Sequence, residues 1–559
     1  MSLPRLIDRA RSALRHRLQG ASAPVQLSAA AAAVAMLGGL AFTVFADASY
    51  APLQAATAPA TATALLATAP SGGTQLAPLR TANPAAVLTS APAPQAAPQI
   101  AEMPADFIPA NAEGSTDNAP FGRIFLPALS NGQQAIDALG RDLPAVAAWY
   151  GKSSGELAEL LRTDATVYVD RKGRLLFVDS GVPPVAASMN ADTHASASAA
   201  RPAVMEAGDV ATVGVPSTSG APFPLDQTFA LHSRSSSSRV IFLNFKGEGS
   251  KPAFSLDKVP GTFNDAEKAM IQKIWLRVAE DYSPFDVDIT TEAPASVTGK
   301  TGVTILITNQ TSDAGGYAYL NSFSALKVSP APAFCFQNKL ANAEKPIAEC
   351  VSHELGHTLG LHHQSTASVT YYGGAGDGET GWAPIMGVSY YKNLTQWAKG
   401  EYAGATNTED AYAVMKKQGL APRADDHGNT ADKADPLVRK ETNGLANLSS
   451  TGVIETPTDV DVFSFVAGAG DLNLAVTPSN WSGNLDVALE LRDAGGKTLG
   501  TSNPATTLGA SITTRITTPG TYYLFVKGTG KGDPRNGGYS NYGSIGQYSV
   551  TGTAALTVR

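Results

Sequence analysis

Cysteine is nearly absent from this chain, because only Cys335 and Cys350 occur among its 559 residues. A closed structural zinc site needs four protein ligands, often several of them cysteines, so the sequence does not favour one. If the chain is exported, the two cysteines can form a disulfide. The closed loop would contribute roughly 3 kcal/mol in the chain-entropy model. We expect this disulfide, and two buried thiols are the alternative.

An excess of positive charge is also missing. The formal net charge is -7, so the chain lacks the basic footprint of a nucleic-acid-binding protein. Beyond residue 48 no apolar run is long enough to span a bilayer. The length exceeds that of one hydrophobic core and predicts roughly three or four units.

The first 48 residues have the pattern of an export signal. Five arginines lie between residues 5 and 17, and the Ala-rich run Leu27–Phe45 carries no charge. Ala46-Asp47-Ala48 is a small-x-small cleavage site. The apolar run is longer than a usual signal core, so an uncleaved membrane anchor is the alternative. In either case we expect the remainder outside the cytoplasm: secreted, or in the periplasm or cell envelope.

Four of the eight histidines fall between residues 353 and 363. On a helix, His353 and His357 lie one turn apart on the same face and can bind one metal ion. Gly360 can adopt a left-handed conformation and end the helix, so that His363 returns as a third ligand. His362 competes for that role, but the spacing selects His363.

Three histidines and a water make the open arrangement of a catalytic zinc site, which predicts Zn²⁺ as the cofactor. Glu354 is turned by about 100° from His353 on a helix of 3.6 residues per turn. Its carboxylate can therefore reach a water on the metal as a general base without being a ligand.

The extended motif His353-Glu354-x-x-His357-x-x-Gly360-x-x-His363 resembles that of the metzincin zinc metallopeptidases. Residues 381–387 supply the methionine-containing turn of that superfamily, with Met386 as the matching residue. Residues 353–360 are most similar to the reprolysin-like branch. That branch usually has Asp after the third histidine, where this chain has Gln364.

Other metzincins place a tyrosine two residues after the methionine, where this chain has Val388. A metal-site role for Tyr390 or Tyr391 is therefore not expected. The resemblance implies a twisted mixed β-sheet with a backing helix and a zinc helix.

Residues 116–182 are predicted to form a small α+β unit. Leu143–Leu161 has helical patterning, with Ser153 and Glu156 spaced as a capping box. The segments 166–169 and 175–178 flank a turn and predict a β-hairpin.

Metzincins are commonly made as zymogens, so the resemblance implies that this unit is a propeptide. A permanent N-terminal module is the alternative. Some metzincins block their zinc with a prodomain cysteine; no cysteine precedes Cys335, so that latch is absent here.

Residues 223–420 are predicted to be the catalytic domain. Asn264–Asp281 reads as an amphipathic helix, with Ile271, Ile274, Trp275 and Val278 on one face. The expected strands are 240–245, 287–290, 303–307 and 333–336. By resemblance Gly316–Phe323 is the edge strand above the cleft, able to pair with an extended peptide substrate. The zinc helix is expected to start near Pro346, and residues 407–417 to form a closing helix.

Short alternating strands follow a polar linker at 421–445 and predict an all-β sandwich over 446–559. Residues 458–552 resemble the bacterial pre-peptidase C-terminal domain, with Pro519-Gly520 as the turn into a strand at 521–526. By that resemblance the sandwich could aid secretion, or bind substrate or a surface. Asp459 and Asp461 could hold calcium, but we expect an acidic strand edge that faces water.

The sequence thus predicts an α+β multidomain protein, a secreted zinc endopeptidase that acts on protein or peptide substrates. One alternative is an inactive zinc-bearing protein whose sandwich does the binding. Another is a cell-envelope adhesion protein that processes only itself. The expected divisions are a signal peptide (1–48), an Ala/Pro-rich linker (49–115), a propeptide (116–182), a second linker (183–222), the peptidase domain (223–420), a third linker (421–445) and the sandwich (446–559).

Overall fold

The computed structural model describes residues 124–181, 220–326 and 331–557, all within one compact unit, Thr89–Arg559. The predicted signal at 1–48, the linker at 49–115 and nearly all of the linker at 183–222 lie outside the described residues. Within the described ranges, none of the helices has the length and apolarity to cross a membrane.

An eight-stranded mixed sheet is the frame of the N-terminal and middle parts of the described chain. In spatial order the strands are β1 (Ser130–Asn131), β2 (Val167–Val169), β3 (Leu175–Asp179), β7 (Gly316–Tyr319), β8 (Ala333–Phe336), β6 (Thr301–Thr308), β4 (Arg239–Asn244) and β5 (Asp288–Thr290). Strands β4, β5, β6 and β8 are parallel to one another, whereas β7 is antiparallel to both β8 and β3.

Two helices share the apolar core of this region. Helix α6 (Asp265–Asp281) starts at a capping box of Asn264 and Glu267 and buries the four apolar residues predicted for its inner face. Helix α7 (Glu344–Thr358) packs against α6, β7 and β8. The Cys335–Cys350 disulfide ties β8 to α7, which confirms the predicted bridge.

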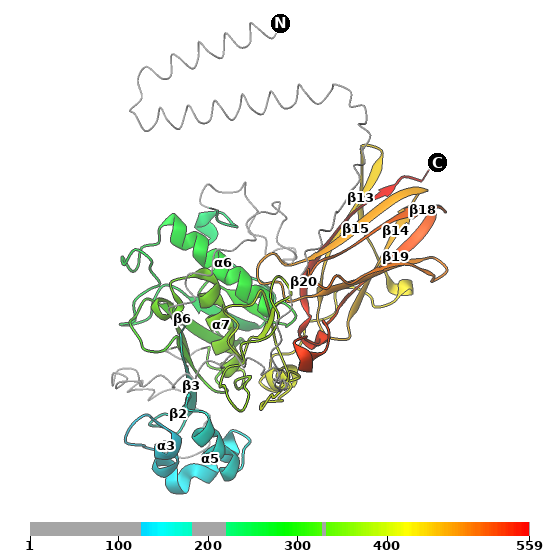
Figure 1. Cartoon of the computed structure of the whole chain (residues 1–559). Helices are drawn as coiled ribbons and strands as arrows, with labels where there is room; N and C mark the ends of the chain where they lie inside the picture. The colour runs from blue at the N-terminus through cyan, green and yellow to red at the C-terminus, as the bar shows by residue number, and fades with distance from the viewer. Residues whose placement is uncertain (1–123, 182–219, 327–330, 558–559) are drawn as a thin grey trace, which may run out of the picture. The chain divides into compact units, whose positions relative to one another are not determined.

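The N-terminal unit contains α3 (Gly132–Leu139), α4 (Leu143–Trp149) and α5 (Ser154–Thr163), packed on the β2–β3 hairpin (Figure 1). The hairpin and the Ser153–Glu156 capping box are confirmed. The single helical segment predicted at 143–161 is two helices, because the chain turns at Gly151 with φ +69°.

One prediction for the sheet is wrong. The strand expected at 316–323 ends at Tyr319, and it is no edge strand, because β3 occupies the side opposite β8. The sequence could not show this, since the pairing partner lies in the segment predicted to be a separate unit. The remaining elements of the region are α8 (Ala411–Lys417), β9 (Trp382–Pro384) and β10 (Leu394–Gln396).

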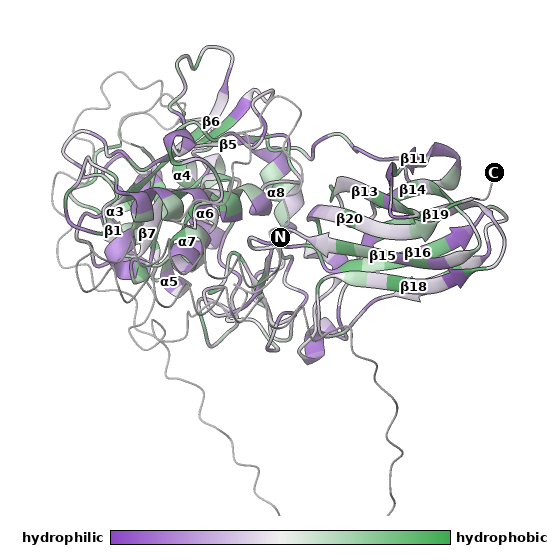
Figure 2. Cartoon of the chain, turned by 90° about the horizontal axis from the view of Figure 1, so that it is seen from above, coloured by the Kyte–Doolittle hydropathy of each residue, from purple (hydrophilic) through white to green (hydrophobic). Residues whose placement is uncertain are grey.

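The C-terminal region is all β. Buried and exposed residues alternate along β15 (Gly470–Pro478) and β18 (Ala510–Ile516), and hydrophobic and hydrophilic colours mix along both strands in Figure 2. The inner faces share one apolar core. One sheet contains β11 (Asp435–Pro436), β14 (Val460–Ala467), β19 (Gly520–Gly528), β16 (Val487–Asp493) and β17 (Thr498–Ser502). The other contains β12 (Val438–Thr442), β13 (Leu445–Ile454), β20 (Gly546–Ala555), β15 (Gly470–Pro478) and β18 (Ala510–Ile516).

The sandwich begins earlier than predicted. Strands β11 and β12 lie within residues 421–445, where the sequence indicates a linker. Strand β12 is exposed at all five positions, so it shows no apolar alternation, and its pairing with β13 defines it instead.

Candidate metal centre

Helix α7 places the first two histidines, and its C-terminus places the third. Gly360 has φ +93°, and hydrogen bonds from Gly360 N to His357 O (2.9 Å) and from Leu361 N to Gly356 O (3.0 Å) close the last turn. A Cβ at residue 360 would lie 2.6 Å from Asn321 Oδ1, so glycine suits this turn in two ways. The chain then reverses, and His363 faces the helix.

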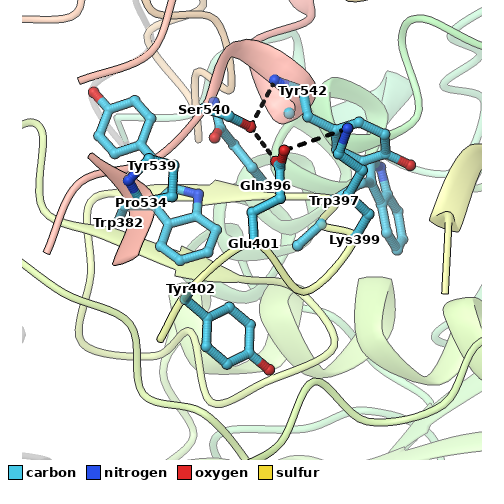
Figure 3. Close-up of a pocket in the computed structure, with 12 residues that line it drawn as sticks. Trp382, Gln396, Trp397, Lys399, Glu401, Tyr402, Pro534, Tyr539, Ser540 and Tyr542 are labelled. Carbon is cyan, nitrogen blue, oxygen red and sulfur yellow. Dashed lines mark hydrogen bonds and ion pairs between the residues drawn. The ribbon is translucent and has the colours of Figure 1, made fainter. Parts of the chain in front are cut away.

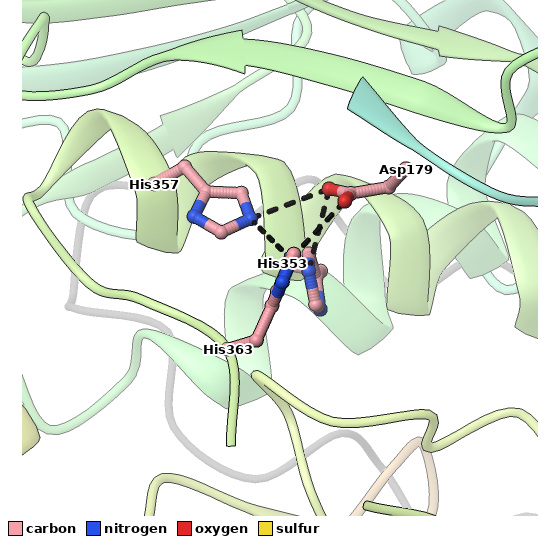
Figure 4. Close-up of side chains that lie close together, drawn as sticks. All are labelled: Asp179, His353, His357 and His363. Atoms are coloured by element: carbon pink, nitrogen blue, oxygen red, sulfur yellow. Dashed lines mark hydrogen bonds and ion pairs between the residues drawn. The ribbon is translucent and has the colours of Figure 1, made fainter. Parts of the chain in front are cut away.

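The ring nitrogens Nε2 of His353, His357 and His363 converge (Figure 4). His353 Nδ1 lies 2.8 Å from Ile385 O and His357 Nδ1 lies 2.7 Å from Leu361 O, so each Nδ1 carries the proton and Nε2 is the free base. The distance between His357 Nε2 and His363 Nε2 is 3.1 Å. Two nitrogens on one tetrahedral zinc would be about 3.4 Å apart.

Zinc therefore fits these residues. His353 Nε2 is buried and has no hydrogen-bond partner in the described part of the chain, although a neutral imidazole nitrogen is a strong acceptor. A metal ion on the three nitrogens would satisfy it, and imidazole is a preferred zinc ligand.

A fourth residue, Asp179, joins the cluster from β3. One carboxylate oxygen, Oδ2, lies 3.5 Å from His353 Nε2 and 3.3 Å from His357 Nε2, and the other, Oδ1, lies 3.1 Å from His363 Nε2. The Tyr371 hydroxyl donates a hydrogen bond of 2.8 Å to Oδ1. Sequence reasoning missed both residues, because neither belongs to the histidine motif.

Further contacts tie the N-terminal unit to the histidines. His363 Nδ1 lies 3.3 Å from Asp164 Oδ2 and 3.4 Å from the Thr166 hydroxyl. The Phe177 ring stacks on His357 with the centroids 4.0 Å apart. The hairpin and the residues just before it therefore cover one face of the cluster.

Glu354, the predicted base, is buried beside the cluster. Its Oε2 has no hydrogen-bond partner within the described ranges. A Cβ on Gly316 would lie 2.1 Å from Glu354 Oε1, so only glycine at that position leaves room for the carboxylate. Burial raises the pKa of Glu354 well above its ordinary value, and the negative charge of Asp179 adds to the rise.

The pKa values of the cluster reflect burial and the shared carboxylate. Burial lowers the pKa of His357 to about 4, against the opposing effect of Asp179. For His363, burial also favours the neutral ring, but Asp179 and Asp164 together raise the pKa to about 10. Burial would raise the pKa of Asp179, but the neighbouring His363, with His353 and His357, holds it well below its ordinary value.

Met386 lies against helix α7, near Gly356. A Cβ on Gly356 of α7 would lie 2.3 Å from Met386 Sδ, and Gln364 N donates 2.7 Å to Met386 O. Met386 thus supports the helix and the third-ligand loop from below. His362 points elsewhere, with Nδ1 3.1 Å from Glu409 Oε2, which agrees with the choice of His363.

The sandwich carries a second cluster of ligand-type groups. Asp425, Asp426 and Glu455 can offer oxygen atoms within 4.8 Å of one another, and so can Asp425, Asp459 and Asp461. The expectation that Asp459 and Asp461 face water is wrong, because both are buried. The reason is that β13, β14 and the segment at 425–426 meet here, which strand alternation alone cannot show.

Two of these carboxylates each have one oxygen with a hydrogen-bond partner and one without: Tyr548 donates to Asp461 Oδ2, and Glu455 N donates to Asp459 Oδ2. Asp459 Oδ1 and Asp461 Oδ1 have no hydrogen-bond partner in the described residues. Burial, with the neighbouring carboxylates, raises the pKa of Glu455 to about 10 and that of Asp461 to about 9. Calcium prefers such a set of oxygen ligands and would offset the burial of negative charge.

A separate pocket lies where the α/β region meets the sandwich (Figure 3). Its aromatic lining is formed by Trp382, Trp397, Tyr402, Tyr539 and Tyr542. Glu401 accepts a hydrogen bond from Ser540 and pairs with Lys399 at 3.3 Å. The pocket is lined by residues of both regions, and Glu401 and Lys399 in its wall pair with each other. This arrangement indicates a structural contact between the two regions.

Comparisons with known proteins identify the sandwich. Residues 459–528 match the family model described as the bacterial pre-peptidase C-terminal domain, which confirms the predicted resemblance of this part. A comparison with curated proteins finds no match to the chain.

Solved structures show weak likenesses to about a fifth of the chain. The pre-peptidase C-terminal domain of a collagenase from Bacillus anthracis is 16% identical, with 22% of this chain and 99% of that one covered and a TM-score of 0.16. PliG of Aeromonas hydrophila, a periplasmic inhibitor of g-type lysozyme, is 14% identical over 22% of this chain and 94% of its own, with a TM-score of 0.16. PliG of Salmonella Typhimurium is 15% identical over 21% and 96%, with a TM-score of 0.12. At these scores the structural likenesses support no conclusion about function.

Proposed function

We propose that the protein is a secreted zinc-dependent endopeptidase of metzincin type. The observation that carries the proposal is the convergence of three buried Nε2 atoms beside a buried carboxylate, Glu354. The two helix histidines are fixed by Nδ1 hydrogen bonds, so the ligand set is preorganised. Met386 under the helix also suits this superfamily.

Each residue has a distinct role. His353, His357 and His363 hold the metal, and when bound, zinc supplies the Lewis acidity that makes water a better nucleophile and polarises a peptide carbonyl. Glu354 accepts the proton of the attacking water and returns it to the leaving amine. Its unpartnered Oε2 is an oxygen on which that proton can reside.

The sandwich and the export signal support action outside the cytoplasm on protein or peptide substrates. The matched domain family takes its name from peptidases. An inactive zinc-bearing protein would have no need of Glu354 at this position, so we place that alternative second.

We also propose calcium as a second cofactor, bound by the acidic cluster of the sandwich. The buried, unpartnered oxygens of Asp459 and Asp461 favour it over the water-facing alternative. Calcium there would stabilise the sandwich and leave the peptide-bond chemistry to the histidine centre.

The test compares the secreted wild-type protein with Glu354→Ala. We expect about one zinc per chain in both, and casein hydrolysis by wild type alone. A wild-type chain without zinc would contradict the metal site. Equal hydrolysis by both chains would contradict the role of Glu354.

A further inference from the structure

The strand that should receive a substrate is already paired. Register places Phe177 opposite Ala318, Val178 opposite Tyr317 and Asp179 opposite Gly316. Gly315 N donates to Asp179 O at 2.7 Å, so the ladder continues to the point where the strand reaches the metal centre. The backbone edge of β7 therefore has no room for an extended peptide while β3 is present.

The same strand ends with its last side chain on the three histidines. The Asp179 carboxylate is buried, and its oxygens lie 3.1 to 3.5 Å from the three Nε2 atoms. Carboxylate oxygen is a zinc ligand, and three histidines with one carboxylate make a closed set of four. A closed set leaves no position for water or a substrate carbonyl.

We propose that Asp179 is a fourth protein ligand of the metal and that the N-terminal unit, through Asp179 and β3, keeps the peptidase inactive until it is removed. The inference rests on the proposed function, because it concerns the same metal. No cysteine precedes Cys335, so a thiol of the N-terminal unit cannot block the metal. In our proposal the Asp179 carboxylate has that role.

The surrounding contacts hold this latch in position. Tyr371 donates its hydroxyl hydrogen to Asp179, Asp164 contacts His363 from the ring's other nitrogen, and Phe177 stacks on His357. All three contacts involve the N-terminal unit. Release of the hairpin would therefore uncover the ligands and the strand edge together.

The first experiment reads the coordination without using activity. The full chain is made in a Glu354→Ala background, which prevents self-cleavage, and is loaded with cobalt(II) in place of zinc. Asp179→Asn is compared with a control, Asp137→Asn, which makes the same change on an exposed residue of the same unit. We expect Asp179→Asn to change the visible absorption of cobalt and to weaken its affinity about 10-fold or more, whereas the control changes neither.

The second experiment reads activity with Glu354 intact. Asp179→Ala and Asp179→Asn should hydrolyse casein about tenfold faster than the uncleaved wild-type chain, because the competent state is no longer a minor population. Asp137→Asn should match wild type. Mass spectrometry confirms that the compared chains are intact, and melting curves confirm that they are folded.

The outcomes separate the two ideas. Unchanged cobalt spectra and unchanged casein rates, in chains that bind metal and cleave, would overturn the latch and leave the peptidase function standing. A changed spectrum without hydrolysis by either Asp179 variant would uphold Asp179 as a ligand, because β3 still pairs with β7 in those chains and can exclude a substrate. Only a chain cleaved after residue 222 that binds metal and still fails to hydrolyse casein would count against the peptidase function. A chain that binds neither cobalt nor zinc would overturn both.

Discussion

The histidine centre and the acidic cluster of the sandwich are both built from buried ligand-type side chains, but they differ in how those side chains are held. In the histidine centre, carbonyl oxygens orient His353 and His357 from behind, so the ligands are fixed before any metal arrives. In the acidic cluster, Asp459 and Asp461 each keep an oxygen without a hydrogen-bond partner among the described residues, and several carboxylates lie together. We propose a preorganised catalytic ion at the first site and an ion that stabilises the fold at the second.

The largest expected effect is a loss of activity on substitution of Glu354, the proposed base of the histidine centre. Glu354→Gln keeps the shape of the side chain but cannot accept a proton, so casein hydrolysis should fall about 10²- to 10⁴-fold. Zinc content, measured by atomic absorption, should stay near that of wild type. Loss of zinc together with activity would mean that Glu354 holds the metal, and the division of roles would be wrong.

The acidic cluster should respond to calcium in stability and not in chemistry. At 100 times its dissociation constant, calcium should add about 2.7 kcal/mol to the free energy of unfolding. Asp461→Asn should abolish this gain in thermal melts, whereas Asp471→Asn, an exposed change on the same sandwich, should retain it. Equal melting temperatures of the wild-type protein with and without calcium would contradict the proposed calcium site.

Glu280 is a third buried carboxyl, and it extends the comparison of the two sites. It is held by hydrogen-bond donors, whereas we propose a cation at each of the other two sites. It accepts hydrogen bonds from Gln547 Nε2 (2.9 Å) and from Gln547 N (3.2 Å) in the sandwich. Burial raises its pKa to about 8, so the stabilising protonated form is fully present below about pH 4.5 and is lost as the pH rises through 8.

Glu280→Gln should therefore stabilise the protein by about 1–3 kcal/mol at pH 9 and by little at pH 4. Urea denaturation at both pH values measures the difference. Glu159→Gln, an exposed change on α5, is the control for replacing a glutamate by a glutamine. A stabilisation that is equal at both pH values would point to packing and not to charge.

The smallest effect is expected at His362, next to the third ligand. Its contact with Glu409 is partly exposed, so His362→Gln should cost at most about 1 kcal/mol of stability and leave zinc bound. His363→Gln should lose zinc under the same dialysis. If His362→Gln loses the metal instead, the assignment of the third ligand is wrong.

The sequence predicted the parts of the molecule whose signals are local. The inner face of α6, the capping box at Ser153, the turn at Gly360 and the β2–β3 hairpin all depend on residues that lie close together in the sequence. His353, Glu354, His357 and His363 belong to the same class, because helix periodicity and one glycine bring them together. These residues were found without the tertiary structure.

Other features depend on which distant segments meet. Asp179 lies 174 residues before His353 in the chain (353 minus 179), and β3 beside β7 turned a predicted edge strand into an inner one. Tyr371, the exposed strand β12 and the burial of Asp461 were missed for the same reason. The sequence of one segment does not show which distant strand it pairs with or which distant residues bury it, because such contacts leave no periodic pattern in either segment alone. The sequence by itself therefore determined the histidine motif and its helix, whereas only the tertiary structure decided what covers them.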